Sequence, residues 1–356
     1  MRNETKTKFK KLLFAIAVAN SVAASGVVAG EQFAVSEPIE TKLNDSVQAS
    51  SEFLTMISMH PVVDMKGQAL DMAAVGMIGG RTDTSGSGER SGTELGAPDG
   101  TTWEVAQTDF DVYIKYPTLD IWARYKDFYS RYMKAVFKAI ALTRITIGWH
   151  GTHAAATTNK ATYPLGQDVN KGWLQVMRDQ VPENIIGEGK HPGMGKIFIG
   201  QSSFNEDYQN LDAAAYDLYQ MIPVERRTGD EVVIVGAALV AADIGKTLTE
   251  HAGKPSEKKL GITTLSATYG GLKAVQVPNF PDNGLVVTDL KNLHLYYQED
   301  RTRRQNQDEP KRNRINDWIS SNDAYAIGDR FAIAAFEPAS VVIVNEKTPD
   351  TVFRTT

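Results

Sequence analysis

The chain has 356 residues, 42% hydrophobic and 23% charged, which is the composition of a globular protein longer than one typical folding core. Its formal net charge of −5 argues against a protein that binds nucleic acid through an overall positively charged surface. The absence of cysteine excludes disulfides, thiolate catalysis and cysteine metal sites, and no apolar run is long enough to span a membrane.

The first 35 residues combine a lysine-rich start, the apolar run LLFAIAVA and small residues after it, which is the layout of a secretory signal peptide. Asn20 and Ser21 interrupt the apolar run early, at the short end of what a signal core needs. The alternative is an amphipathic helix with one apolar face formed by Phe9, Leu12, Leu13 and Ile16. This pattern leaves both interpretations open.

Residues 33–58 are expected to form an extended stretch, interrupted by Pro38 and ending in the apolar segment EFLTMISM. Two short strands follow, and residues 79–100 form a polar, glycine-rich loop. The returning strand ends with Val112 and Ile114 in alternation. A long hairpin with a polar tip cannot bury a core of its own, so it needs another surface to lie on.

Residues 116–150 predict one long helix, because no glycine or proline follows Pro117 until Gly148. Thr118 is placed to cap the first turn. Apolar residues recur every three or four positions, at Trp122, Tyr125, Tyr129, Tyr132, Val136 and Ile140. We expect this face, including Trp122, Tyr125 and Tyr129, to pack against the core, and the other segments to be arranged around the helix.

The second half of the chain alternates strands and helices. EVVIVG (231–236) predicts a buried strand, AALVAADIGKTLTEHAG a helix, and GGLKAVQVPNF, NGLVVTDL and NLHLYYQED further strands. This order predicts an α/β unit over residues 230–300. Two more strands in RFAIAAFEPASVVIVN close the fold.

The segment Gly245–Thr247 resembles the end of a phosphate-binding loop after a strand. Such a loop needs four residues between its two glycines so that consecutive amides wrap the anion. Here eight residues separate Gly236 from Gly245, and they are helical in pattern. A nucleotide site is therefore not expected.

The histidines do not form a recognisable site either. His150 and His153 lie three positions apart, but no nearby side chain supplies a third metal ligand. His60 and Asp64 are equally unsupported. The sequence has no G-x-S-x-G and no H-E-x-x-H motif, so the usual local signatures of serine hydrolases and zinc proteases are absent.

Residues 299–317 contain both signs of charge in close alternation, which nearly cancels the local field. Pairing of opposite charges between subunits is the preferred interpretation, because such patterns specify protein partners. A solvated face is the alternative, and DNA contact comes last.

Several segments in order along the chain resemble the major capsid proteins of P2-type tailed phages. They include MRNETKTKF, SSEFLTMISMHPV, TDTSGSGER, FDVYIKYPTLDIWARYKDF, PLGQDVNKGWLQ, EVVIVGAALVA, AVQVPNFPDNGLVVTDLKNLHLYYQEDRTRR and NDAYAIGD. The resemblance covers nearly the whole chain and is more specific than any short catalytic pattern.

The resemblance implies an α+β protein with the Hong Kong 97-type phage capsid fold. It also implies these boundaries: an N-terminal segment at 1–33 that is removed on maturation, an N-arm at 34–58, an E-loop hairpin at 59–115, a spine helix at 116–150, a P-domain from 151–229 with 315–356, and an A-domain at 230–314.

The resemblance further implies a structural protein, without enzymatic activity, cofactor or metal, that assembles into hexamers and pentamers of an icosahedral head around double-stranded DNA. Its implied partners are other copies of itself, an internal scaffold, a maturation protease, a portal protein and packaged DNA, with no membrane. It would be a virion component assembled in the host cytoplasm.

We expect charged residues of the E-loop and of the mixed-charge segment to contact neighbouring subunits: Arg81, Glu89, Arg90, Arg301, Arg303, Arg304, Asp308, Glu309 and Arg312. Cleavage is expected near Phe33 and Ala34. Two other classes stay open at this point, namely a secreted β-rich protein behind a signal peptide and a nucleotide-using α/β enzyme.

Overall fold

The computed structural model describes residues 3–20, 22–35, 37–69, 79–85, 89–90, 100–125, 127–200, 206–250 and 268–344. The chain divides into two compact units. Unit 1 comprises Met1–Gly67, Trp103–Gly172 and His294–Tyr325, and unit 2 comprises Gln68–Thr102, Trp173–Leu293 and Ala326–Thr356. Most of the predicted loop at 79–100 lies outside the described residues.

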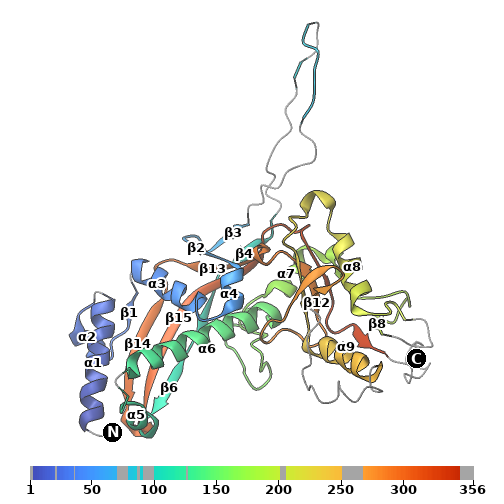
Figure 1. Cartoon of the computed structure of the whole chain (residues 1–356). Helices are drawn as coiled ribbons and strands as arrows, with labels where there is room; N and C mark the ends of the chain where they lie inside the picture. The colour runs from blue at the N-terminus through green and yellow to red at the C-terminus, as the bar shows by residue number, and fades with distance from the viewer. Residues whose placement is uncertain are drawn as a thin grey trace. The chain divides into compact units, whose positions relative to one another are not determined.

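Unit 1 is built on a seven-stranded sheet with the order β1-β14-β15-β13-β2, in which β5 and β6 also pair with β15 (Figure 1). The strands are β1 (Phe33–Ala34), β2 (Ser58–Val62), β5 (Ala106–Asp109), β6 (Val112–Lys115), β13 (Leu293–Gln298), β14 (Arg303–Glu309) and β15 (Arg314–Ile327). The long β14–β15 hairpin turns through the short 3₁₀ helix η4 (Pro310–Arg312) and Asn313, whose φ of 51° is left-handed. The predicted alternation in β6 is confirmed.

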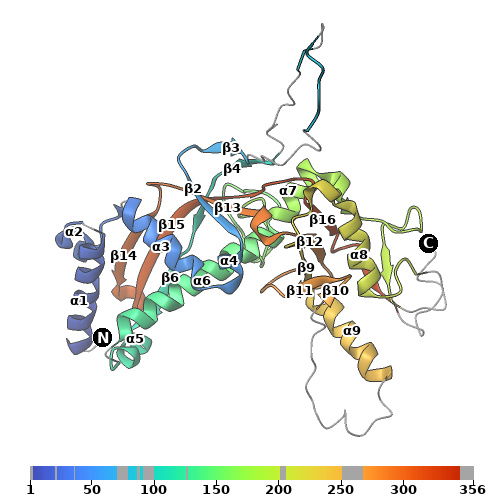
Figure 2. The same cartoon turned by 45° about the horizontal axis from the view of Figure 1, so that its top comes forward.

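The helices of unit 1 are α1 (Asn3–Ala19), α2 (Ala24–Ala29), α3 (Glu37–Gln48), α4 (Glu52–Met56), α5 (Tyr116–Trp122) and α6 (Phe128–His150). The α1–α2 pair lies beside β14, and α6 runs along the sheet (Figures 1 and 2). Buried Leu13 and Ile16 on one face of α1 confirm the amphipathic-helix interpretation of this segment.

The expectation of an extended stretch over 33–58 is wrong, because most of it is helical in α3 and α4. Pro38 is tolerated because it stands in the first turn, where its missing N–H has no helical partner to lose. Glu40, Asn44 and Val47 recur at helical spacing and are all buried. Two of these three residues are polar, so the buried face was hidden from a search for apolar periodicity.

The predicted continuous helix over 116–150 is instead two helices, α5 and α6, with a break between them (Figure 1). The amide of Tyr125 bonds the carbonyl of Trp122 at 3.0 Å, a tighter turn than an α-helix makes. Tyr125 is 51% exposed, so its predicted core position is wrong. Lys8 Nζ donates to the carbonyl of Ala123 at 2.7 Å and thereby satisfies a backbone group at the break.

Unit 2 is built on a six-stranded sheet with the order β10-β11-β9-β12-β16-β7. These strands are β7 (Ile185–Ile186), β9 (Val232–Val235), β10 (Thr268–Tyr269), β11 (Leu272–Val275), β12 (Leu285–Thr288) and β16 (Ile333–Phe336). A separate pair in unit 2 joins β8 (Ile197–Ile199) to β17 (Val341–Ile343). The short strands β3 (Lys66–Gln68) and β4 (Thr102–Glu104) form a two-stranded sheet of their own and belong to neither larger sheet. The 3₁₀ helices η1 (Pro182–Asn184), η2 (Val224–Arg226) and η3 (Leu290–Asn292) complete the connections.

The helices of unit 2 are α7 (Trp173–Gln180), α8 (Leu211–Met221) and α9 (Ala237–Glu250). Leu218 of α8 and Leu239 of α9 join one buried cluster with Val233, Leu285 and Phe336, so both helices pack on the same face of the sheet (Figure 2). Burial of the apolar side chains between this face and the two helices stabilises unit 2.

The strand–helix–strand order predicted for residues 231–293 is present as β9, α9, β11 and β12. The next predicted strand, β13, pairs with β15 and β2 of unit 1 and not with the strands of this α/β unit, and β14 likewise pairs with β15. Strand pattern alone does not reveal which sheet a strand joins, because that choice depends on residues distant in the sequence.

Candidate assembly interface and its buried support

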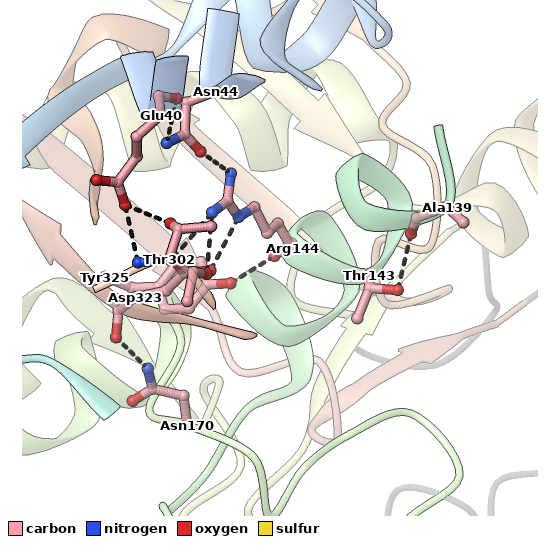
Figure 3. Close-up of polar contacts among 10 residues, drawn as sticks. Glu40, Asn44, Ala139, Thr143, Arg144, Asn170, Thr302, Asp323 and Tyr325 are labelled. Atoms are coloured by element: carbon pink, nitrogen blue, oxygen red, sulfur yellow. Dashed lines mark hydrogen bonds and ion pairs between the residues drawn. The ribbon is translucent and has the colours of Figure 1, made fainter. Parts of the chain in front are cut away.

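Arg144 of α6 is 2% exposed and lies at the centre of a polar network (Figure 3). Its Nε and Nη2 each donate to the carboxylate of Asp323 at 2.9 Å, which is a bidentate pair. Its Nη1 donates to Oδ1 of Asn44 at 2.9 Å. Three elements, α6, β15 and α3, therefore meet at one guanidinium.

Neighbouring groups complete the network on the β15 side. Ser321 Oγ donates to Asp323 at 2.8 Å, Tyr325 Oη donates to the backbone carbonyl of Arg144 at 2.9 Å, and Asn170 Nδ2 donates to the carbonyl of Asp323 at 2.8 Å. Burial raises the pKa of Tyr325 well above its usual value, so this hydroxyl stays a donor. Thr143, the residue before Arg144 on α6, points away from the network and donates to the carbonyl of Ala139 (Figure 3).

Glu40 of α3 ties this helix to the turn between β13 and β14 (Figure 3). Its carboxylate accepts from the amides of Asp300 at 2.7 Å and Thr302 at 3.1 Å, and from the Thr302 hydroxyl. Burial raises the pKa of the Glu40 carboxyl, although the hydrogen bonds from Thr302 and Asp300 oppose that shift. Asn44, one helical turn on, links Glu40 to the Arg144 network through α3 itself.

A second buried pair joins β14 to β15. Arg304 Nη2 lies 2.7 Å from Asp317, whose carboxylate also accepts from Tyr132 Oη at 3.0 Å. Arg304 is therefore internal, and its side chain is not at the surface of the subunit. The expectation that Arg304 contacts a neighbouring subunit is corrected here, because its position in the strand alternation turns it inward.

Both networks were missed in the sequence. The only signal was a lone arginine, Arg144, within the apolar segment LTRITI, where a charge needs an internal partner. Asp317 and Asp323 lie among polar residues and look like surface positions. The networks fix α6 against β14 and β15, and they give the subunit a rigid support.

The remaining charged residues of the mixed-charge segment lie on the outside of unit 1. Arg301, Arg303, Asp308 and Arg312 are exposed. Asp308 accepts a hydrogen bond from Tyr116, and burial together with this carboxylate raises the Tyr116 pKa to about 12.

Glu309 is half-buried and lies 3.2 Å from Arg312 and 2.7 Å from Arg314. Hydrogen bonds from Asn316 and Arg314 hold the pKa of the Glu309 carboxyl below its usual value. Glu309 is thus already paired with arginines of its own chain, whereas Arg301 and Arg303 are exposed at the surface.

Arg81, Glu89 and Arg90 of the predicted E-loop are exposed. The Asp83 carboxylate accepts from both the amide and the hydroxyl of Ser85, at 2.9 and 2.6 Å, which forms a local turn.

The predicted cleavage position lies in β1. Phe33 and Ala34 pair antiparallel with Arg304 and Arg303 of β14. Glu31 and Gln32, just before this strand, are exposed. A protease therefore meets exposed residues just before β1 and paired backbone within it.

The other motifs do not form sites in the described parts of the chain. Gly245–Thr247 lies inside α9 and forms no phosphate-binding loop. His153 bonds its neighbour Thr152, and His60 packs against His294 at 5.3 Å between ring centroids. Among the described residues there is no group of three or more His, Asp or Glu that could hold a metal ion. No helix in those ranges is long and apolar enough to cross a membrane.

Comparison with known proteins gives a consistent result along almost the whole chain. The family described as phage major capsid protein, P2 family, matches residues 8–339. The capsid protein of Escherichia phage P2 is 33% identical over 348 residues, which cover 96% of each chain. The major capsid protein of Serratia phage KSP20 is 29% identical over 342 residues, covering 92% of this chain and 94% of the relative.

Among solved structures, a chain of the satellite phage P4 procapsid that includes the size determination (Sid) protein superposes with a TM-score of 0.74. It is 30% identical, and the match covers 97% of this chain and 99% of that one.

Proposed function

This chain belongs to the P2 family of phage major capsid proteins and has the Hong Kong 97-type fold, and from that premise we propose how it builds a phage head. Copies of it form hexamers and pentamers of an icosahedral shell around double-stranded DNA. Similarity to a capsid protein over 96% of the chain, with a family match over residues 8–339, carries this proposal because it extends over both units and most of the N-terminal segment.

We assign the capsid regions with boundaries adjusted to the sheets. The A-domain corresponds to the α/β part of unit 2 at residues 230–293, since β13 and β14 pair within unit 1. The spine comprises α5 and α6, and the β14–β15 hairpin with its partner strands forms the P-domain scaffold beside it. Residues 59–115 supply the E-loop.

Contacts between subunits use charges of the E-loop and of the mixed-charge segment that are exposed, namely Arg81, Glu89, Arg90, Arg301, Arg303, Asp308 and Arg312, together with the half-buried Glu309. Opposite charges interleaved on one surface fit a self-associating protein, because each copy offers both signs to its neighbours. The buried Arg144 and Arg304 pairs support this surface and do not touch the neighbour.

The proposed partners beyond other copies are an internal scaffold, a maturation protease, a portal protein and packaged DNA held by non-specific contact. Assembly takes place in the host cytoplasm, and the finished protein resides in the virion. The proposed role is structural and involves no catalytic residue, cofactor or metal.

Electron microscopy of the purified chain, expressed with and without its phage's scaffold, tests the assembly. Shells or capsomers with six- and five-fold symmetry are expected. A chain that stays monomeric in both cases would overturn the assembly proposal.

Charge reversal tests the contact surface. Arg303→Glu together with Arg312→Glu should reduce assembly, whereas Lys134→Glu, an exposed change of the same kind on α6, should not. If both variants assemble equally well, the mixed-charge segment is not part of the interface between subunits.

A further inference from the structure

The α1–α2 pair, hereafter the N-terminal hairpin (Asn3–Ala29), packs on the rest of unit 1 through a buried apolar cluster. Leu13, Ile16 and Ala17 of α1 and Val27 of α2 pack with Leu119 and Ile315. Partly buried neighbours surround this cluster: Phe9, Val22, Ala24, Phe33, Ile114, Tyr116, Trp122 and Tyr132. The hairpin therefore covers apolar side chains of α5, β6 and β15.

Polar contacts fix the hairpin at both ends. Lys8 Nζ donates to the carbonyl of Ala123 at the break between α5 and α6, at 2.7 Å. Gln305 Nε2 of β14 donates to the carbonyl of Gly30 at 2.7 Å. Gly30 ends α2 with a left-handed φ of 79°, a conformation that glycine adopts without strain.

The hairpin is also closed on itself. The amide of Val22 bonds the carbonyl of Ala17 at 3.0 Å, and Asn20 Nδ2 donates to the carbonyl of Ile16 at 2.7 Å. The amide of Glu31 bonds the carbonyl of Gly26 at 3.0 Å. All of these contacts lie on the N-terminal side of Gln32.

We propose that the rest of unit 1 carries a binding site for the N-terminal segment, and that this site does not depend on the peptide bond between them. A cut between the exposed residues Glu31 and Gln32 leaves every one of those contacts in place and leaves β1 with the body of the chain. The excised segment stays bound, and the apolar surface stays covered until the segment dissociates.

This inference rests on the proposed processing and adds a second step to it. Before the cut, the covalent link keeps the hairpin at a high effective concentration next to its site. After the cut, occupancy depends on the concentration of free segment, which is high inside a closed shell and falls on dilution. The vacated site accepts the segment of a second copy equally well, because it recognises the same residues.

The two faces of α1 provide a matched pair of substitutions. Ile16 is 1% exposed and points into the cluster, whereas Phe14 is 58% exposed and points away from it. Both are large apolar residues of one helix. Their replacement by Asp therefore separates binding at this site from a general change in the segment.

The experiment uses the full chain with a recognition sequence for a specific protease inserted between Glu31 and Gln32. After cutting, a synthetic peptide of residues 1–31, carrying a fluorophore, is exchanged into the site and followed by fluorescence anisotropy. Unlabelled peptides carrying wild-type sequence, Ile16→Asp or Phe14→Asp then compete. Since the substitutions are on the peptide, the folded chain is identical in every arm.

The excised segment should co-elute with the body of the chain on gel filtration. The Phe14→Asp peptide should compete within about twofold of wild type, as surface changes do, and the Ile16→Asp peptide at least about tenfold more weakly, because it buries an unpaired charge. Immediate separation of the two pieces, or equal competition by both variants, would overturn the binding site. N-terminal sequencing of mature particles tests the processing separately.

Discussion

The guanidinium of Arg144 and the carboxylate of Asp323 form two hydrogen bonds of 2.9 Å each, and both side chains are almost completely buried. Their attraction offsets the desolvation of two charges only while both partners are present. The pair joins α6 to β15, so it connects the spine to the longest strand of unit 1.

Asp323→Ala should lower the free energy of unfolding by about 3–5 kcal/mol, because it leaves Arg144 charged and buried without its carboxylate. Denaturant titration followed by circular dichroism measures this change. The control is Asp127→Ala, which removes the partner of Arg131 in an ion pair that is more than half exposed, and little change is expected there. Similar losses in the two variants would show that burial does not decide the strength of the Arg144 pair.

Leu119→Ala and Tyr125→Ala should differ, because the break after α5 turns Leu119 inward and Tyr125 outward. Leu119 is 1% exposed, so its truncation should cost about 2–5 kcal/mol through lost burial and a cavity. Tyr125 is 51% exposed and its ring lies 4.8 Å from the Arg131 guanidinium, so its loss should stay within about 1 kcal/mol. A larger loss of stability in Tyr125→Ala would contradict the break and support the uninterrupted helix face predicted from the sequence.

Glu40 should make stability depend on pH in the direction opposite to an ordinary ion-paired carboxylate. Its pKa in the folded chain is raised above the usual 4.5, chiefly by burial, so the folded state binds a proton that the unfolded state releases. The stabilising contribution is complete below pH 4.5 and is lost as pH rises through the folded-state value. Unfolding of wild type and Glu40→Gln is compared between about pH 4 and pH 7. The stability of wild type relative to the variant should fall across that range, and a rise would contradict the raised pKa.

Trypsin should cleave the unassembled subunit after Arg81 and Arg90, since both side chains are exposed. In assembled shells the same bonds should be protected, because the E-loop is proposed to lie on a neighbouring subunit. Mass spectrometry of digests taken over time from both states measures the difference. Equal cleavage rates would place the loop away from any neighbour.

The spacing of apolar residues along the sequence predicted those helices and strands in which one regular repeat marks the buried face. Buried Val233 and Val235 in β9, and buried Val136 and Ile140 in α6, lie where the apolar spacing placed them. The family resemblance predicted the fold class, which no single segment defines.

The rest depended on contacts between distant residues. The break after Trp122 contains no glycine or proline, and one of its carbonyls is satisfied by Lys8, 115 residues away in the sequence. The helix α3 has a buried face made largely of Glu40 and Asn44, whose partners lie in the turn between β13 and β14 and in α6. Likewise Arg304 looks like its exposed neighbours until its pairing with Asp317 is known.

The last prediction concerns where the N-terminus of the mature chain begins. A cut before β1 falls at the exposed residues Glu31 and Gln32, whereas a cut at Phe33 or Ala34 first requires β1 to separate from β14. Proteases bind their substrates as extended, unpaired chain, so the accessible bonds should be cut first. N-terminal sequencing of subunits from mature particles should therefore give a start between Glu31 and Ser36, with Gln32 or Phe33 the most abundant.

Strengthening β1 provides the control for that prediction. Ala34→Val raises the β-propensity of the strand without touching the bonds at Glu31 and Gln32. If cutting occurs before the strand, this variant matures at the wild-type rate; if it occurs within the strand, maturation slows. Subunits that retain Met1 in infectious particles would remove the processing step altogether and leave the fold and the family assignment unchanged.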